Sequence, residues 1–167
     1  MEITLEQMLK SRDERHERQQ RLLQQHPGMT LVCMTTIMPG PVKRNMASLV
    51  TAHAGLTELL TYLGGQLRDV TVLDLPTGYE AYLIVDRSPM RTKVTTCAIE
   101  DSHPIGRLMD IDVIGHDGVP ISRKDAGQQP RRCLLCEHEA QWCMRNHTHS
   151  REELKAKIDQ MIADYVQ

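Results

Sequence analysis

The sequence predicts an α+β fold with a mostly antiparallel or mixed sheet. Amphipathic helical repeats and β-branched apolar runs are interspersed along the 167 residues, without the steady strand–helix–strand rhythm of a parallel sheet. This length corresponds to about one domain. The hydrophobic fraction, 40%, is that of an ordinary globular protein. We therefore expect one domain with its own core over residues 1–167.

The N-terminal helix is predicted from its capping residues. Thr4 with Gln7, and Ser11 with Glu14, each fit the capping box that begins a helix. We expect a helix over about residues 4–25 with a break near Ser11. Arginines recur every three residues and share one broad face, which is either solvated or meets an anionic ligand: Arg12, Arg15 and Arg18.

Three further helices are expected. One follows from an apolar repeat that ends at Gly64-Gly65. Another begins at Ser88-Pro89 and runs to about Glu100, and the last begins after Ser150. His53 lies on the apolar stripe of the first of these helices and is interpreted as a core histidine. The whole stripe comprises Met46, Leu49, Val50, His53, Leu56, Leu59, Leu60 and Leu63.

Apolar, β-branched runs predict five strands. They are Thr30–Met38, Val70–Leu75, Tyr79–Val85, Met109–Gly115 and Val119–Ser122. The turn residues Pro76-Thr77-Gly78 and Asp117-Gly118 each join two of these runs into a hairpin. The expected organisation is a helical segment, an α+β core, a basic loop rich in Cys and His, and a C-terminal helix, over 1–26, 30–122, 123–149 and 150–167.

Composition excludes several functional classes. Twenty basic residues stand against 22 acidic ones, so the net charge of −2 argues against a general nucleic-acid coat or a polybasic membrane anchor. With no Phe and one Trp, an aromatic platform for nucleic acid is not expected either. Because no apolar run approaches the roughly 18 residues of a membrane span and the N-terminus lacks the features of a signal peptide, we expect a cytoplasmic protein without a membrane partner. Its five cysteines then read as thiols or metal ligands.

Two acids on one predicted strand form the first candidate site. Residues two apart on a strand point the same way, so Asp110 and Asp112 should lie about 7 Å apart on one face. Carboxylates so close repel each other unless a cation such as Mg²⁺ lies between them. Gly106 and Arg107 immediately precede the strand and could bind a phosphate. A helix, a glycine turn and a strand with two acids is the arrangement of polymerase-β-type nucleotidyltransferases. Incidental acids on a solvent-facing edge strand are the alternative.

Three dibasic pairs stand out in this nearly neutral chain: Lys43-Arg44, Arg123-Lys124 and Arg131-Arg132. Each pair alone is explained by a solvated loop. A polyphosphate substrate would give all three a shared purpose.

A cluster of cysteines and histidines lies near the C-terminus. Cys133 and Cys136 have the Cys-x-x-Cys spacing, and Cys143 with His147 could complete a tetrahedral zinc site. Such a site would be structural, because four protein ligands leave no open position. Structural thiols without a metal explain the pattern equally well. Cys33 and Cys97 lie in apolar patterns and are expected in the core.

Taken together, these segments resemble the phosphoribosyl-dephospho-CoA transferases of citrate lyase, also called its holo-acyl-carrier-protein synthases. The matching motifs spread from residue 11 to about 149. They are Ser11-Arg12-Asp13-Glu14-Arg15 with Arg18-Gln19, Pro39-Gly40-Pro41 with Lys43, Ser102-His103-Pro104 through Gly106-Arg107-Leu108 to Asp110-Ile111-Asp112-Val113, Ser122-Arg123, and Pro130-Arg131-Arg132-Cys133-Leu134-Leu135-Cys136.

The resemblance implies a reaction and its partners. The donor is 2′-(5″-triphosphoribosyl)-3′-dephospho-CoA, and the acceptor is a serine of the acyl carrier subunit of citrate lyase. The serine oxygen attacks the α-phosphate and pyrophosphate leaves.

In that chemistry, we expect Asp110 and Asp112 to hold Mg²⁺. Arg107 and the backbone of Gly106 would hold the triphosphate, and the dibasic residues Lys43, Arg44, Arg123 and Arg131 are the other candidates for substrate binding. The general base is not identified by the sequence. His103 is one candidate, since its ordinary pKa suits neutral pH, and Glu100 and Asp125 are others.

Other functions are compatible with parts of the pattern. An enzyme of the same fold could act on another carrier, such as that of malonate decarboxylase. A non-catalytic module could use the Cys/His cluster as a zinc knuckle. A scaffold subunit could bind the carrier without modifying it.

Overall fold

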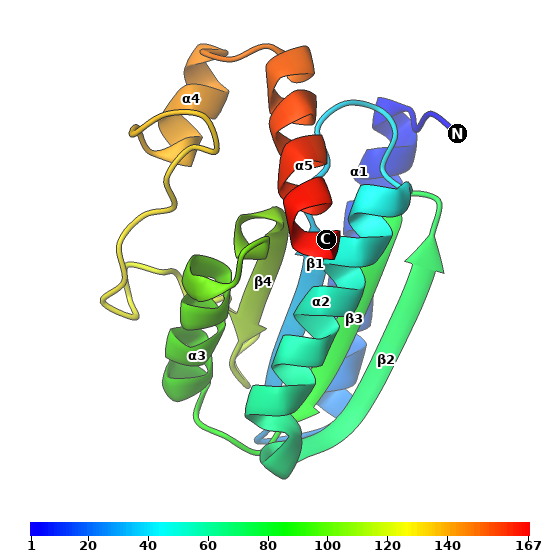
Figure 1. Cartoon of the computed structure of the whole chain (residues 1–167). Coiled ribbons are helices and arrows are strands. Elements are labelled where there is room, and N and C mark those ends of the chain that lie inside the picture. The colour runs from blue at the N-terminus through cyan, green and yellow to red at the C-terminus, as the bar shows by residue number, and fades with distance from the viewer.

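A computed structural model describes residues 1–167, and its centre is a four-stranded antiparallel sheet (Figure 1). The strand order is β2-β3-β1-β4, so β2 and β4 form the two edges. The strands are β1 Thr30–Thr36, β2 Leu67–Leu75, β3 Gly78–Val85 and β4 Met109–Ile114. This confirms the α+β class and the antiparallel sheet.

The helices cover both faces of the sheet (Figure 1). On one face lies α1, Leu5–Gln25, whose Leu23 packs on Leu31 and Tyr82. On the other face α2, Met46–Leu63, α3, Pro89–Ser102, and α5, Arg151–Val166, enclose the larger core. Two short 3-10 turns, Gly64–Gln66 and Gly106–Leu108, precede β2 and β4. No helix is long and apolar enough to cross a membrane.

Strand alternation decides which side chains of β4 are buried. Met109, Ile111 and Val113 lie in the core shared with α2, α3 and α5. Asp110 and Asp112 therefore face the side of α1. The alternating apolar and acidic residues of this strand predicted this division.

The N-terminal helix is continuous, so the expected break near Ser11 is wrong. Thr4 and Gln7 form the predicted capping box. Ser11 is buried in the middle of the helix, where its hydroxyl is 2.8 Å from that of Thr77 in the β2–β3 hairpin. The Ser11 hydroxyl bonds to a residue of another element and does not cap a helix. The capping-box pattern of Ser11 and Glu14 therefore wrongly predicted a helix start at this position.

The second helix has its predicted bounds, but its buried face is rotated from the predicted stripe, of which only Leu59 and Leu63 are fully buried. Small residues meet the sheet: a Cβ atom on Gly55 would lie 2.5 Å from the Met34 sulfur. The larger Met46 and Leu60 are exposed at 70% and 39%. His53 is exposed too, so its interpretation as a core histidine is wrong. The helix approaches the sheet closely, and only small side chains fit between them.

The segment after β4 also differs from expectation. Instead of a strand over 119–122, one isolated bridge joins Ile114 and Pro120, and Ile121 donates to the carbonyl of Val113 at 2.9 Å. Proline cannot donate a backbone hydrogen bond, so the ladder stops. The basic Cys/His-rich loop contains a helix that the sequence did not predict, α4, Ala140–Asn146. In Figure 1 this segment runs beside the β4 edge and returns to α5.

Candidate active site

Two carboxylates mark the site on the α1 side of β4. Asp110 pairs with Thr35 of β1 in the sheet register, and Asp112 pairs with Cys33. Both acids keep contact with solvent. The structure therefore brings the predicted acidic pair to one face of β4, the edge strand of the sheet.

The electrostatics of this pair favour a cation. Burial raises the pKa of Asp112, and the negative charge of Asp110 raises it further. Lys93, Arg131 and Arg15 act in the opposite direction without cancelling the effect. A divalent cation between the carboxylates would remove the repulsion and supply the missing positive charge. Hard carboxylate oxygens on one strand face, open to solvent, fit the ligand preference of Mg²⁺.

Arg131 connects the acidic pair to the edge of β4. Its guanidinium lies 2.6 Å from Glu100, at the end of α3, and 3.5 Å from Asp110. It also donates to the backbone carbonyl of Met109. The sequence predicted Arg131 as a substrate-binding residue, and the structure places it in contact with one of the two acids.

Glu100, in the last turn of α3, contacts the same edge of β4. It is 3% exposed and accepts a hydrogen bond from the amide of Ile111 at 2.9 Å. Arg123 reaches it at 2.8 Å, and Arg131 binds the other carboxylate oxygen. Burial raises the pKa of Glu100, while Arg131, the Ile111 amide, Lys93 and Arg123 lower it. Because these donors occupy Glu100, it serves to hold two arginines and the β4 backbone in place.

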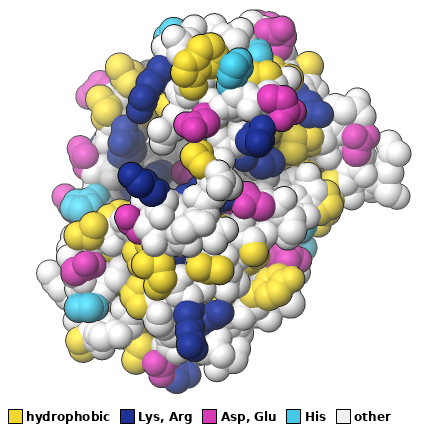
Figure 2. All heavy atoms as spheres, turned by 90° about the vertical axis from the view of Figure 1, so that its left-hand side faces the viewer, with side chains coloured by type: hydrophobic (Ala, Val, Ile, Leu, Met, Phe, Trp, Pro, Cys, Tyr) yellow, Lys and Arg dark blue, Asp and Glu magenta, His cyan; other side chains and the backbone are white.

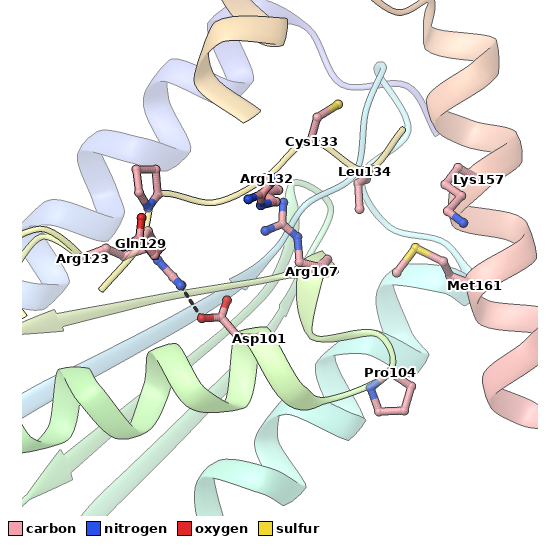
Figure 3. Close-up of a pocket in the computed structure, with 11 residues that line it drawn as sticks. Asp101, Pro104, Arg107, Arg123, Gln129, Arg132, Cys133, Leu134, Lys157 and Met161 are labelled. Carbon is pink, nitrogen blue, oxygen red and sulfur yellow. Dashed lines mark hydrogen bonds and ion pairs between the residues drawn. The ribbon is translucent and has the colours of Figure 1, made fainter. Parts of the chain in front are cut away.

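A basic cleft of about 500 Å³ adjoins this edge (Figure 3). Arg107, Arg123 and Arg132 line it, with Lys157 on the α5 side. Burial lowers the pKa of Arg107, and the positive charge of Arg131 lowers it further. Arg123 is held by Asp101 at 2.5 Å. Crowded positive charge in a cleft is relieved by an anionic ligand, so the cleft suits a polyphosphate.

The outer surface shows the same distribution of charge. Figure 2 shows Lys and Arg side chains gathered in its upper half around a hollow, with Asp and Glu between them. The lining of the cleft combines residues from α3, the turn before β4, the 123–149 loop and α5. Sequence reasoning missed Arg132 as a separate candidate, and it missed Lys157 because this lysine reads as part of a solvated helix.

Sequence reasoning also missed a buried ionic cluster on the same sheet face. Glu80 of β3 is 2% exposed and pairs with Arg15 at 2.8 Å and with Arg18 at 3.2 Å. The Tyr82 hydroxyl also bonds to Glu80. Thus the arginine face of α1 is partly turned inward, and only Arg12 of the three is exposed. A lone Glu in an otherwise apolar strand was the signal that could have revealed this cluster.

The comparisons with known proteins agree with one another. Residues 3–165 match the family model described as apo-citrate lyase phosphoribosyl-dephospho-CoA transferase. A relative of that name from Escherichia coli O1:K1 / APEC is 36% identical over 165 residues, which is 97% of this chain and 90% of the relative. A relative of the same name from Shigella boydii serotype 18 has the same identity and coverage. The chain belongs to this family. The resemblance seen in the sequence motifs is thereby confirmed.

Within this family member, the glycine of the Gly106-Arg107 turn has a steric explanation. A Cβ atom on Gly106 would lie 2.6 Å from the backbone oxygens of both Ile99 and Glu100. Its amide already donates to the carbonyl of His103 at 2.9 Å. The glycine is needed because the turn packs directly on the end of α3. Phosphate binding by this backbone stays a prediction.

His103 ends α3 and contacts the C-terminal helix. Its Nδ1 atom lies 3.2 Å from the amide of Ile105, and its ring lies 5.2 Å from that of Tyr165. None of its hydrogen bonds reaches the acidic pair. Catalysis by His103 therefore stays a prediction, and the geometry gives this residue a capping role.

The two residues of the first dibasic pair have different surroundings. Arg44 binds Asp74 of β2 through two bonds of 2.6 Å, at the sheet edge opposite β4. Lys43 donates to the carbonyl of Met38 at 2.6 Å. Burial lowers the pKa of Lys43, and the charge of Arg151 adds to this effect. The structure thus assembles Arg107, Arg123 and Arg131 without Arg44.

The Cys/His cluster forms with one change of membership. The ligand atoms of Cys133, Cys136, Cys143 and His149 all lie within 4.8 Å of one another. The sequence predicted His147 as the fourth member, which is wrong. His147 is exposed and ends α4 with a left-handed backbone, φ +47°. It turns the chain so that His149 returns to the cysteines.

Proposed function

We propose that this protein transfers the phosphoribosyl-dephospho-CoA group from 2′-(5″-triphosphoribosyl)-3′-dephospho-CoA to a serine of the citrate lyase acyl carrier protein, releasing pyrophosphate. The name of its relatives supports both the transferred group and apo-citrate lyase as the target. The single observation that carries the proposal is the placement of Asp110 and Asp112 on one face of β4, joined through Arg131 to an arginine-lined cleft.

The cleft provides the charge that the donor needs. A triphosphate brings several negative charges, and Arg107 and Arg132 can offer donors to its oxygens. Arg123 adds positive charge to the cleft while its guanidinium bonds Gln129, Glu100 and Asp101. Lys157 adds a fourth positive charge from α5. Because Glu100 and Asp101 fix Arg123, the cleft is ordered before the substrate arrives. This arrangement positions the donor without covalent help from the protein.

We assign the transfer step to the acidic pair. Asp110 and Asp112 would hold Mg²⁺, which neutralises charge on a transferring phosphate. The serine oxygen forms a bond to the α-phosphorus while the bond from this phosphorus to the bridging oxygen breaks. Pyrophosphate leaves, and the serine proton passes to a base. Arg131 holds Asp110 at the boundary between the acids and the cleft.

The contacts of Glu100 and Asp125 make these two acids less suitable as the general base. Glu100 is held by two arginines and a backbone amide. Asp125 accepts hydrogen bonds from the hydroxyl of Ser122, at 2.6 Å, and from its amide. Both carboxylates are thus already used within the fold.

The proposed reaction belongs in the cytoplasm, which the five free cysteines of the chain support.

Intact-mass measurement of the carrier tests the reaction. The protein is incubated with Mg²⁺, the triphosphoribosyl donor and the apo-carrier of citrate lyase. A gain equal to the donor minus pyrophosphate supports the proposal. No gain, while a positive-control enzyme modifies the same carrier, contradicts it. A gain only on the malonate decarboxylase carrier would keep the chemistry and change the acceptor.

Substitution of one acid tests the assignment of the site. Asp110→Asn removes a charge from the pair without changing its size, so transfer should fall by at least about 100-fold. Thermal unfolding should change little, because Asp110 is exposed. Asp86→Asn is the matched control, since this exposed acid pairs with Arg68 instead. Normal transfer by Asp110→Asn would show that the acidic pair is not the site.

A further inference from the structure

We propose that Cys133, Cys136, Cys143 and His149 form a structural Zn²⁺ site that fastens the arginine-bearing loop to the edge of β4. The ligand set is three sulfurs and one imidazole, which is a common donor set of structural zinc. The site is separate from the acidic pair. Its occupancy can be measured without donor or carrier, so it stands independently of the proposed reaction.

The distances within the cluster are close to those of a tetrahedral metal site, with all four ligand atoms within 4.8 Å of one another. The sulfurs of Cys136 and Cys143 are 3.4 Å apart, and Nε2 of His149 is 3.3 Å from the sulfur of Cys136. A tetrahedral zinc ion places two sulfur ligands about 3.8 Å apart, and a sulfur and a nitrogen about 3.6 Å apart. The four ligand atoms are thus close enough together for one zinc ion to bind them after small shifts of the side chains.

Hydrogen bonds of the backbone around the cysteines hold the four ligands close together. The amide of Leu135 donates to the sulfur of Cys133 at 3.5 Å and so helps to position this side chain. The amide of Cys133 donates to the carbonyl of His138 at 2.8 Å, closing a tight loop around Cys136. On the other side, the amide of Thr148 bonds to the carbonyl of Cys143 at 3.1 Å and brings His149 back.

Apart from the ion pairs of Arg123 and Arg131, this segment has few contacts that hold one conformation. Between residues 123 and 149, Cys143 is the single buried residue. The only helix there, α4, has seven residues. A segment with so few buried apolar side chains needs a cross-link, such as a bound metal or a disulfide, to keep one conformation. A metal bound by four of its side chains provides one, because the bound form exists only when the loop is folded.

The proposed zinc site lies close along the chain to two arginines of the candidate active site. Arg131 lies two residues before Cys133 and contacts Glu100 and Asp110. Cys133 itself lines the basic cleft, as does Arg132 (Figure 3). A metal at Cys133 therefore fixes the backbone from which both arginines extend.

Metal analysis of the purified full chain is the first test. We expect one zinc ion per chain after gel filtration, or uptake of one zinc by chelator-treated protein. Cobalt in its place should give the intense visible absorption of a tetrahedral thiolate site. Protein that neither contains nor takes up metal would overturn the proposal. A Cys136–Cys143 disulfide under non-reducing conditions would do the same, since the sulfurs would then be unavailable.

A matched pair of histidine variants tests the ligand set. His149→Asn should weaken zinc binding by at least about 100-fold, as expected for a lost ligand. His147→Asn should bind zinc normally, because asparagine tolerates the left-handed backbone at this position. The reverse result would show that the assignment of the fourth ligand is wrong. Cys136→Ser and Cys97→Ala provide the corresponding cysteine pair, with loss expected only for the former.

Limited proteolysis tests the fastening. Trypsin should cleave after Arg131 and Arg132 at least about 10-fold faster once zinc is removed, because local opening of the loop exposes these bonds. Cleavage after Arg68, on the far side of the sheet, should not change and serves as the internal reference. Equal rates after Arg131 with and without bound zinc would overturn the fastening role.

Discussion

Replacing Gly106 with alanine tests how the turn before β4 is built. The added Cβ atom would lie 2.6 Å from two backbone oxygens, those of Ile99 and Glu100. An ordinary contact begins near 3.4 Å, so the turn or the end of α3 must move by about 0.8 Å. These obstacles are backbone atoms in the last turn of a helix and cannot rotate away.

The expected loss of stability follows from this overlap. Overpacking typically destabilises a protein by about 1–3 kcal/mol, and rigid backbone favours the upper part of this range. For a chain of this size the midpoint of thermal unfolding should fall by about 3–10 °C. Because Arg107 is the next residue, a displaced turn should also slow transfer by at least about 10-fold.

Urea denaturation of Gly106→Ala beside Gly64→Ala provides the assay. Gly64 has a right-handed helical backbone, and nothing lies within 4 Å of a Cβ atom built on it. Alanine at this position should be neutral or stabilise by up to about 1 kcal/mol. If Gly106→Ala stays within about 0.5 kcal/mol of the parent protein, the steric explanation of this glycine is refuted.

Two further outcomes are expected. Arg107→Ala should slow transfer strongly, whereas Arg44→Ala should leave it unchanged in a kinetic assay, because Arg44 binds Asp74 at the far sheet edge; equal losses would contradict this separation. Burial raises the pKa of Cys33 from 9.0 to about 12, so the folded protein keeps a proton that the unfolded chain loses between these values. The free energy of unfolding should therefore fall as pH rises from 9, by up to about 1.4 kcal/mol per pH unit from this thiol. Cys33→Ala should show a weaker decline in urea denaturation at pH 8 to 10.5, and parallel curves would contradict the assignment.

The sequence by itself determined the elements with strong local signals. Capping residues located the start of α1 at Thr4 and that of α5 at Ser150, and Pro89 located the start of α3. Alternation on β4 placed both acids on one face. These signals act over a few residues, where backbone hydrogen bonding and side-chain spacing are set by the chain itself.

Tertiary structure decided which face of α2 meets the sheet and which charges meet each other. The apolar repeat of α2 was genuine, yet Ala54 and Gly55 lie at the closest approach because helix-to-sheet distance selects small side chains. Likewise Glu80 finds Arg15 across a separation of 65 residues. The residues around Glu80 and those around Arg15 do not indicate in the sequence that these two side chains will pair.

The candidate site shows the same division. Asp110, Asp112 and Arg107 were found from spacing and neighbouring residues, whereas Lys157 enters the cleft only because α5 packs beside the loop. His149 replaced His147 because the left-handed residue after α4 reverses the chain. Spacing along a chain limits which ligands can meet, but the direction of the backbone between them decides which ones do.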